Sequence, residues 1–370
     1  MDQALHQIVE RIRAATSDAT PLCIRGGGTK DFHGEALQGE VLSTSALTGI
    51  TSYEPSELVV TVRAGTPLAE LEAVLAEKGQ CLPFEPPHFG TSGATTVGGM
   101  VAAGLSGPAR ASVGAVRDYV LGATLVNGRG ELLSFGGQVM KNVAGYDVSR
   151  VLAGSLGTLG VIAEVSLKVL PVAPAEATLE FACGQADALR LLNEWGGRPL
   201  PLNASCWFEY AGAGALYLRL RGAVAAVEAA CTHLGGERKD NVRAAADWQA
   251  LRDQQLPWFA TTEGPDALWR LSAPQTAPVL AMDGAVPLIE WHGGQRWYKA
   301  PLRQAVRIRE IARAAGGHAT LFRLPAGADA QTGAPRFDAL SAPVARIHRA
   351  LMHEFDPHRL FNRGRLFAAE

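Results

Sequence analysis

Apolar residues recur at helical spacing near both ends of the chain. Residues 5–12 place leucine, isoleucine and valine at i, i+3, i+4 and i+7, the stripe of an amphipathic helix with one buried face. Residues 344–355 repeat such a stripe up to Asp356-Pro357, where the proline ring prevents a helix from continuing. The pattern therefore predicts a helix at each end.

The first 170 residues alternate strand-like and helix-like patterns with frequent glycines. Residues 57–66 form a β-branched run typical of a strand. The helix predicted next has Thr66 as its N-cap, Pro67 at its first position and Gly79 at its end. Residues 118–137 predict a hairpin that turns at Asn127-Gly128, and residues 159–171 predict a strand that ends at Pro171.

The texture of the sequence changes after Pro171. Glycine clusters become rarer, and strand-like runs at 205–210 and 215–222 alternate with a helical pattern at 223–236. Residues 318–325 predict the last strand of this part. We therefore divide the chain into domains at 1–170 and 171–332, with a C-terminal segment at 333–370.

Composition narrows the classes of function. A formal net charge of −2, from 34 Lys+Arg against 36 Asp+Glu, leaves no basic field for nucleic acid. The five cysteines are spread out without a C-x-x-C pair, which disfavours a disulfide framework, an iron–sulfur cluster or a zinc site. No apolar run reaches the roughly 20 residues of a membrane span. We expect a cytoplasmic protein without metal, nucleic-acid partner or integral membrane segment.

The stretch IRGGGTKDFHG at 24–34 is the first candidate site. Glycine backbone can approach a phosphate because no Cβ intervenes, and Arg25 and Lys30 supply positive charge nearby. The stretch is neither a Walker A loop nor a G-x-G-x-x-G dinucleotide motif. Taken alone, it fits a phosphate cradle and a plain turn about equally.

Two further glycine-rich stretches follow at 90–107 and 145–162. The first contains Thr95-Thr96 and Gly98-Gly99, and the second spaces Gly154, Gly157 and Gly160 three residues apart. Each stretch alone is also explained by close packing of helix against sheet. Three such stretches within the first 162 residues together predict one extended, phosphate-bearing cofactor held at several points.

Other chemistries have weaker signals. His353 and His358 are separated by Pro357, a poor spacing for metal ligands, and no G-x-S-x-G nucleophile motif is present. The aromatic residues Trp291, Trp297 and Tyr298 fit either a pocket or, more often, a core.

The order and spacing of these stretches resemble the FAD-binding domain of the vanillyl-alcohol oxidase/PCMH flavoprotein superfamily. Within it, VRDYVLG at 116–122, EWHGGQRWYKA at 290–300, GHATLFR at 317–323 and FNRGRLF at 361–367 resemble the FAD-binding subunits of bacterial glycolate oxidases. The resemblance implies an α+β fold: a two-lobed FAD-binding domain, an α/β cap domain and a C-terminal helix that returns to the FAD domain.

The resemblance also implies site residues. The loop from Arg25 to Lys30 would hold the FAD diphosphate. The implied cofactor-binding residues are Arg25, Gly26, Gly27, Gly28, Thr29, Lys30, Pro87, Thr95, Thr96, Gly98, Gly99, Asp118, Gly157, Gly160, Ile162 and Asn362. Relatives with covalently bound flavin carry R-x-G-G-H in this loop, and Thr29 stands in place of that histidine. We therefore expect noncovalent FAD.

The catalytic motifs of related 2-hydroxy-acid dehydrogenases are missing. Those relatives share a His-x-His pair and a Glu-His-Gly motif in the cap, whereas this chain has Trp291 between Glu290 and His292 and no H-x-H. The nearest substitutes for a base and carboxylate-binding cations are His292, Arg296, Lys299 and Arg323.

The resemblance thus implies a FAD-binding subunit that relays electrons or supports assembly in a glycolate oxidase complex. Its expected partners are a larger catalytic FAD subunit and an iron–sulfur subunit, with glycolate as the substrate of the complex. The expected location is the cytoplasm or the inner face of the cell membrane, where a partner could dock the chain. Two alternatives stay open: a structural subunit with a vestigial FAD site, and an independent FAD-dependent 2-hydroxy-acid dehydrogenase.

Overall fold

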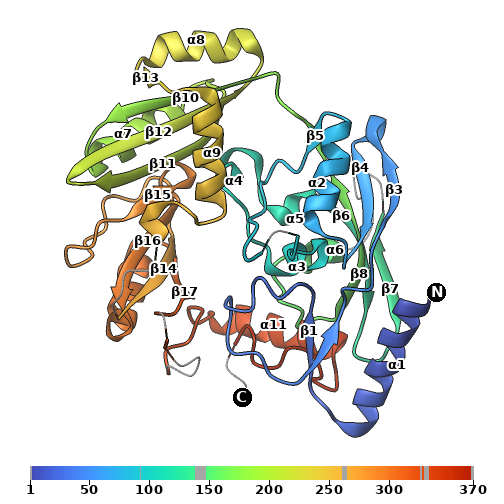
Figure 1. The fold of residues 1–370 in the computed structure, drawn as a ribbon. Helices are drawn as coiled ribbons and strands as arrows, with labels where there is room; N and C mark the ends of the chain where they lie inside the picture. The colour runs from blue at the N-terminus through green and yellow to red at the C-terminus, as the bar shows by residue number, and fades with distance from the viewer. Residues whose placement is uncertain are drawn as a thin grey trace. The chain divides into compact units, whose positions relative to one another are not determined.

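The computed structural model describes residues 2–91, 93–137, 147–260, 265–325, 327–328 and 333–367. The chain forms two compact units (Figure 1). Unit 1 contains Met1–Leu105, Ala115–Pro171 and Ala339–Glu370, and unit 2 contains Ser106–Gly114 and Val172–Asp338. Nothing in the sequence pattern had indicated that residues 106–114 leave one unit to join the other. The boundaries at 170 and 332 stay predictions, and residue 332 lies outside the described residues.

Unit 1 is built around a five-stranded antiparallel sheet in the order β3-β4-β8-β6-β7. Its strands are β3 (Ile50–Glu54), β4 (Val59–Arg63), β6 (Val120–Val126), β7 (Leu132–Gly136) and β8 (Val161–Lys168). The central strand β8 has nearly all its side chains buried, because it pairs with β4 and β6 and is covered by helices. Helix α2 (Leu68–Glu77) buries Leu68, Leu71 and Leu75 in this core, and α3 (Val97–Ala103) joins it with Met100.

The rest of unit 1 brings distant parts of the chain together. Strands β1 (Leu22–Arg25) and β2 (Glu40–Ser43) pair in parallel, and the segment after the C-terminal helix adds beside β1 through a bridge from Leu22 to Phe361. The other elements are α1 (Gln3–Asp18), η1 (Pro55–Glu57), β5 (Gln80–Cys81), α5 (Val116–Tyr119), α6 (Val148–Val151), β9 (Leu170–Pro171) and α11 (Ala342–Phe355).

Unit 2 contains an eight-stranded antiparallel sheet in the order β13-β10-β12-β11-β15-β16-β14-β17. Its strands are β10 (Ala175–Ala182), β11 (Leu202–Tyr210), β12 (Ala213–Gly222), β13 (Glu237–Arg238), β14 (Asp266–Ser272), β15 (Leu288–Glu290), β16 (Gln295–Pro301) and β17 (His318–Arg323). Its helices are α4 (Arg110–Val113), α7 (Gln185–Gly196), α8 (Val224–Leu234), α9 (Asn241–Arg252), η2 (Pro257–Phe259), η3 (Trp291–Gly293), η4 (Leu302–Gln304) and α10 (Ala305–Ala314).

Helices cover both faces of this sheet. Neighbouring side chains of a strand point to opposite faces, so consecutive residues contact different helices. On β10, Leu179 packs into a core with residues of α7 and α8, whereas Thr178 accepts a hydrogen bond from Trp248 of α9. Figure 1 accordingly shows α7 behind the strands and α9 in front of them.

Most elements predicted from periodicity are present, with local corrections. The N-terminal helix, the 118–137 hairpin and the strand ending near Pro171 are confirmed. Thr66 is not the N-cap of α2, because its hydroxyl accepts the Gly49 N–H and Pro67 takes the cap position. The hairpin turn is longer than predicted: Gly130, not Asn127-Gly128, has positive φ, and Asn127 instead accepts two backbone N–H groups of the turn.

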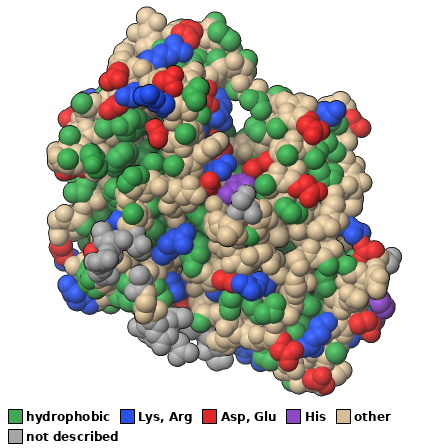
Figure 2. All heavy atoms as spheres, viewed as in Figure 1, with side chains coloured by type: hydrophobic (Ala, Val, Ile, Leu, Met, Phe, Trp, Pro, Cys, Tyr) green, Lys and Arg blue, Asp and Glu red, His purple; other side chains and the backbone are tan. Residues whose placement is uncertain are grey.

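Helix α11 forms as predicted but buries less of its apolar stripe than the pattern suggested. Val344 and Ile347 are exposed, whereas Phe355 is buried in the core of unit 1. Within the described ranges no helix is long and apolar enough to cross a bilayer. Acidic and basic side chains are interspersed over the face in view in Figure 2, in agreement with the balanced charge.

Candidate functional site

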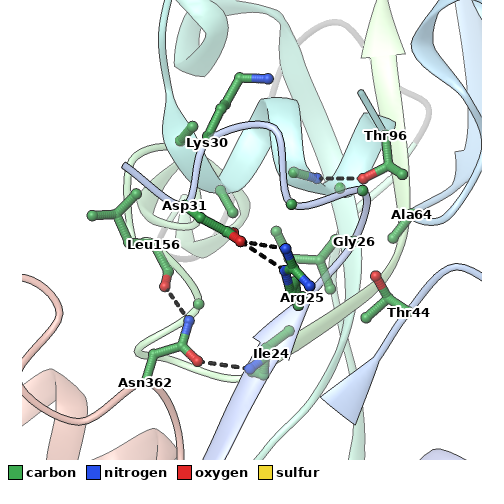
Figure 3. A pocket seen from close by; sticks show the side chains of 18 of the residues that line it. Ile24, Arg25, Gly26, Lys30, Asp31, Thr44, Ala64, Thr96, Leu156 and Asn362 are labelled. Atoms are coloured by element: carbon green, nitrogen blue, oxygen red, sulfur yellow. Dashed lines mark hydrogen bonds and ion pairs between the residues drawn. The ribbon is translucent and has the colours of Figure 1, made fainter. Parts of the chain in front are cut away.

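The three glycine-rich stretches line one pocket of unit 1 (Figure 3). The loop after β1, helix α3 and the segment before β8 each contribute to its wall. Thirteen predicted cofactor residues line it: Arg25, Gly26, Gly27, Gly28, Thr29, Lys30, Thr96, Gly98, Gly99, Gly157, Gly160, Ile162 and Asn362. The sequence had therefore indicated most of the wall of one site.

The first loop turns tightly after β1. Gly28 has φ +71°, and its carbonyl accepts the Asp31 N–H at 3.1 Å. Gly27 lies so near the neighbouring loop that an added Cβ would stand 1.4 Å from the Ala94 carbonyl oxygen. Glycine is needed at these two positions by the protein's own backbone, before any ligand is considered.

The same loop presents free backbone donors. Among the described residues, the N–H groups of Gly26, Gly27, Gly28 and Thr29 donate to no protein acceptor. Successive unbonded N–H groups in a turn form a concave site for an anion. The loop therefore fits the diphosphate of a dinucleotide.

The second stretch has a different role. Gly98 N–H donates to the Ala64 carbonyl at 2.7 Å, and Gly99 N–H donates to the Thr96 hydroxyl at 3.2 Å. Because these donors are already satisfied, Thr96, Gly98 and Gly99 shape the wall of the pocket through close packing. Thr95 lies behind the wall and hydrogen-bonds the Thr29 hydroxyl at 3.2 Å.

Asn362 joins two parts of the pocket. Its side-chain oxygen accepts the Ile24 N–H at 2.7 Å, and its amide nitrogen donates to the Leu156 carbonyl at 2.6 Å. A Cβ on Gly157 would lie 2.6 Å from that amide nitrogen. A C-terminal residue thus fixes the spacing between the first and third glycine stretches (Figure 3).

Arg365 is a residue that the sequence analysis missed. Its guanidinium donates to the carbonyls of Lys30, Asp31 and Glu35, which holds the first loop closed from the C-terminal segment. No local sequence pattern links residues 330 or more positions apart. The other lining residues that were missed are Ile24, Asp31, Leu37, Thr44, Ala64, Ala102, Ala103 and Leu156.

Three predicted cofactor residues do not line this pocket. Pro87 is buried in the 85–89 loop, and Thr95 lies behind the wall as described. The Asp118 carboxylate accepts the Ala115 N–H at 2.8 Å, so it stabilises the first turn of α5. A cofactor contact for these three residues stays a prediction.

In unit 2, His292 is held by two hydroxyl groups. Its Nε2 lies 3.0 Å from Ser112 Oγ, and its Nδ1 lies 3.0 Å from Ser205 Oγ. Burial lowers the pKa of His292 to about 4. The neighbouring Trp291 donates its indole N–H to the Gly107 carbonyl, and the Arg110 guanidinium stacks on its ring.

Arg296 is fully buried and has a structural set of contacts. Its guanidinium donates to the backbone carbonyls of Gly293, Pro278 and Ala277. These three bonds tie the end of the β15–β16 hairpin to an irregular segment of the same unit. The geometry therefore gives Arg296 a role in the fold rather than at a substrate.

Lys299 and Arg323 lie opposite Leu268 on either side of β14. Lys299 donates to the Ala260 carbonyl at 2.8 Å, and Arg323 donates to the Gln254 side chain. Burial lowers the pKa of Lys299 and lowers that of Arg323 to about 10. These hydrogen bonds are made to residues other than His292 and Arg296.

Comparison with known proteins identifies the family. Residues 4–136 match the model of a family described as an FAD binding domain. The chain is 45% identical over 361 residues to glycolate oxidase subunit GlcE of Escherichia coli (strain K12), an alignment that covers 98% of this chain and 97% of that protein. The chain belongs to the GlcE family.

Other relatives match less of this GlcE-family chain. Glycolate oxidase subunit GlcD of Bacillus subtilis (strain 168) is 31% identical over 49% of the chain and 38% of its own length. D-2-hydroxyglutarate dehydrogenase of Xanthomonas citri pv. viticola is 30% identical over 50% of the chain and 39% of its own length. A solved structure of alkyldihydroxyacetonephosphate synthase shares the fold, with a TM-score of 0.66 and 15% identity over 96% of this chain and 75% of that one.

These matches confirm the α+β FAD-binding fold, the superfamily and the oxidoreductase class expected from the sequence. FAD is the cofactor of the GlcE-family chain. The pocket of unit 1 fits it, because the free N–H groups of residues 26–29 suit a diphosphate and glycines keep the wall clear of Cβ atoms. Noncovalent attachment stays a prediction.

The buried His292 of this GlcE-family chain predicts an acid-sensitive contribution to stability. Its pKa is about 4 when folded and about 6.5 when unfolded, so only the unfolded chain takes up this proton between those values. The contribution of His292 to stability is therefore present above pH 6.5 and is lost as the pH drops toward 4. We expect this residue to account for about 2 kcal/mol of the loss between pH 7 and 5.

Urea unfolding of the natural chain and of His292→Asn at pH 7, 6 and 5 measures this difference. The variant should lose less stability over that range, and the remaining histidines, His318 among them, are common to both proteins. Parallel decline of the two curves would show that His292 does not remain neutral in the folded chain.

Proposed function

We propose that this chain is the FAD-binding subunit of a multisubunit glycolate oxidase, which oxidises glycolate to glyoxylate. In this proposal the chain relays electrons or supports assembly, and a larger FAD subunit carries the main catalytic site. The observation that carries the proposal is the state of His292, whose ring nitrogens are both engaged and whose pKa is about 4.

The argument rests on what the reaction requires. Hydride transfer from a 2-hydroxy acid needs a base for the hydroxyl proton and cations for the carboxylate, all close to the flavin. A histidine with a pKa near 4 binds a proton weakly at neutral pH, and Arg296 is committed to backbone carbonyls. The four residues that sequence reasoning selected therefore do not supply this set together.

Bound FAD supplies the redox chemistry of such a subunit. In this proposal the N–H groups of the 26–29 loop would hold its diphosphate, and Asn362 and Arg365 would keep the segments around that loop in place. The proposal includes an iron–sulfur subunit as a further partner, because the chain lacks a cluster-binding cysteine motif. It also includes a cytoplasmic location, with docking at the inner face of the cell membrane through a partner.

The absorbance of the purified chain between about 350 and 500 nm tests the proposal. We expect a flavin band that acid releases from the protein, and no bleaching of that band when glycolate is added without oxygen. The same addition to the chain co-purified with its larger FAD subunit should bleach the flavin. A colourless, folded chain would instead support a structural subunit, and bleaching of the isolated chain would support an independent dehydrogenase.

A further inference from the structure

Arg25 lies in the FAD pocket, but its guanidinium already has a partner there. Its Nε donates to Asp31 Oδ2 at 2.8 Å, and a second guanidinium nitrogen contacts the same oxygen. Asp31 comes six residues later, on the far side of the turn at Gly28. In Figure 3 the two side chains point toward one another inside the pocket, whereas Lys30 points away from them.

The guanidinium is packed against the turn that it would have to leave to reach a ligand. A Cβ on Gly28 would lie 2.4 Å from the nearest Arg25 nitrogen and 2.8 Å from its central carbon. The Asp31 backbone is fixed as well, because its N–H donates to the Gly28 carbonyl and its carbonyl accepts from Arg365. The turn thus determines where Asp31 holds the guanidinium.

The consequence for binding is electrostatic. Partly exposed ion pairs contribute at most about 1 kcal/mol to stability, so this pair matters more for the charge that it presents than for the fold. Arg25 and Asp31 together contribute no net charge to the loop. In the described part of this loop the N–H groups of residues 26–29 are unbonded, and the Arg25 guanidinium keeps one nitrogen outside its pair with Asp31.

We propose that Asp31 is a positioning residue of the FAD site: it holds Arg25 against the turn, so that the diphosphate is bound by backbone N–H groups and not by the Arg25 side chain. Arg25 then stabilises the loop instead of serving as a phosphate ligand. The inference rests on FAD binding to this pocket.

A double-mutant cycle on the full chain distinguishes the two roles. FAD is removed and titrated back, and its dissociation constant is read from flavin fluorescence for Arg25→Gln, Asp31→Asn and the double variant. If Asp31 neutralises Arg25, then Arg25→Gln weakens binding about threefold to fivefold, because the carboxylate is left uncompensated near the diphosphate. Asp31→Asn tightens binding by a similar factor at low salt, and the double variant returns to within about twofold of the natural chain.

The opposite result has a distinct signature. If Arg25 binds phosphate directly, Arg25→Gln and the double variant both weaken binding by about 30-fold or more, and the second change restores nothing. Arg307→Gln, Asp283→Asn and their combination are the matched controls, since this exposed pair lies in unit 2 and changes the net charge equally. Failure of the natural chain to bind FAD at all would refute FAD binding itself, not the role of Asp31.

Discussion

We expect Gly27→Ala to weaken FAD binding strongly and to destabilise the chain. A Cβ at this position would stand 1.4 Å from the Ala94 carbonyl oxygen and 2.6 Å from its carbon. Backbone cannot yield to that extent locally, so the 26–29 loop must move away from the neighbouring segment. The four N–H groups would then no longer converge, and FAD affinity should fall by about 100-fold or more.

The cost in stability follows from overpacking. Inserting a methyl group into a filled site costs about 1–3 kcal/mol. Flavin fluorescence titration and urea unfolding of the apoprotein measure the two effects separately. Gly137→Ala is the matched control, because Gly137 belongs to the same unit and an added Cβ there meets nothing within 4 Å.

A Gly27→Ala variant that binds FAD with near-natural affinity would contradict this account. It would mean that the backbone at Ala94 gives way without disturbing the loop, so the fixed spacing between Gly27 and Ala94 would not be part of the binding site. Equal stability losses in Gly27→Ala and Gly137→Ala would indicate a general sensitivity to alanine and not a specific clash.

The sequence predicts much of the wall of this pocket, because a glycine marks a position where the backbone needs a positive φ or a close approach. Gly27, Gly28 and Gly157 are needed where two segments approach closely or where φ is positive. Such positions can be found from the residue type alone. The roles of other glycines in the pocket cannot be found from the residue type alone. Gly98 and Gly99 donate their N–H groups to Ala64 and to the Thr96 hydroxyl and not to a ligand. These partners come together only in the folded chain.

The two C-terminal residues that hold the pocket together, Asn362 and Arg365, also show what sequence reasoning could not find. Asn362 was identified through a resemblance, whereas Arg365, three positions later, carries no local signal for its contacts with the 30–35 segment. Thr66 illustrates the reverse error. Threonine is a common N-cap residue, but the Thr66 hydroxyl accepts the Gly49 N–H, because the pairing of β3 with β4 places Gly49 nearby.

The candidate catalytic residues of the expected cap domain were chosen by residue type. The residue type does not show whether a side chain already hydrogen-bonds within the protein. His292, Arg296 and Lys299 are near one another in sequence, yet β16 carries Lys299 away from the hairpin end that holds the other two. Charge alone could not show that Arg296 is fully buried.

Replacing Arg296 by alanine should unfold unit 2 at much lower urea concentration. The side chain is fully buried, and its three nitrogens donate to the carbonyls of Gly293, Pro278 and Ala277. Alanine leaves these acceptors without a donor and leaves a void, for a combined cost of about 3–5 kcal/mol. Unfolding followed by tryptophan fluorescence in urea measures the loss.

Two further variants separate a structural role from a catalytic one. Arg296→Lys keeps the positive charge but replaces a fork of donors by one ammonium group, so we expect most of the destabilisation to persist. Arg190→Ala removes an exposed arginine of the same unit that pairs with Asp187 and Glu194, and should cost less than about 1 kcal/mol. If Arg296→Ala instead kept its natural stability, the three carbonyl bonds would not hold the hairpin end. Arg296 would then return to the set of cations available to a substrate carboxylate.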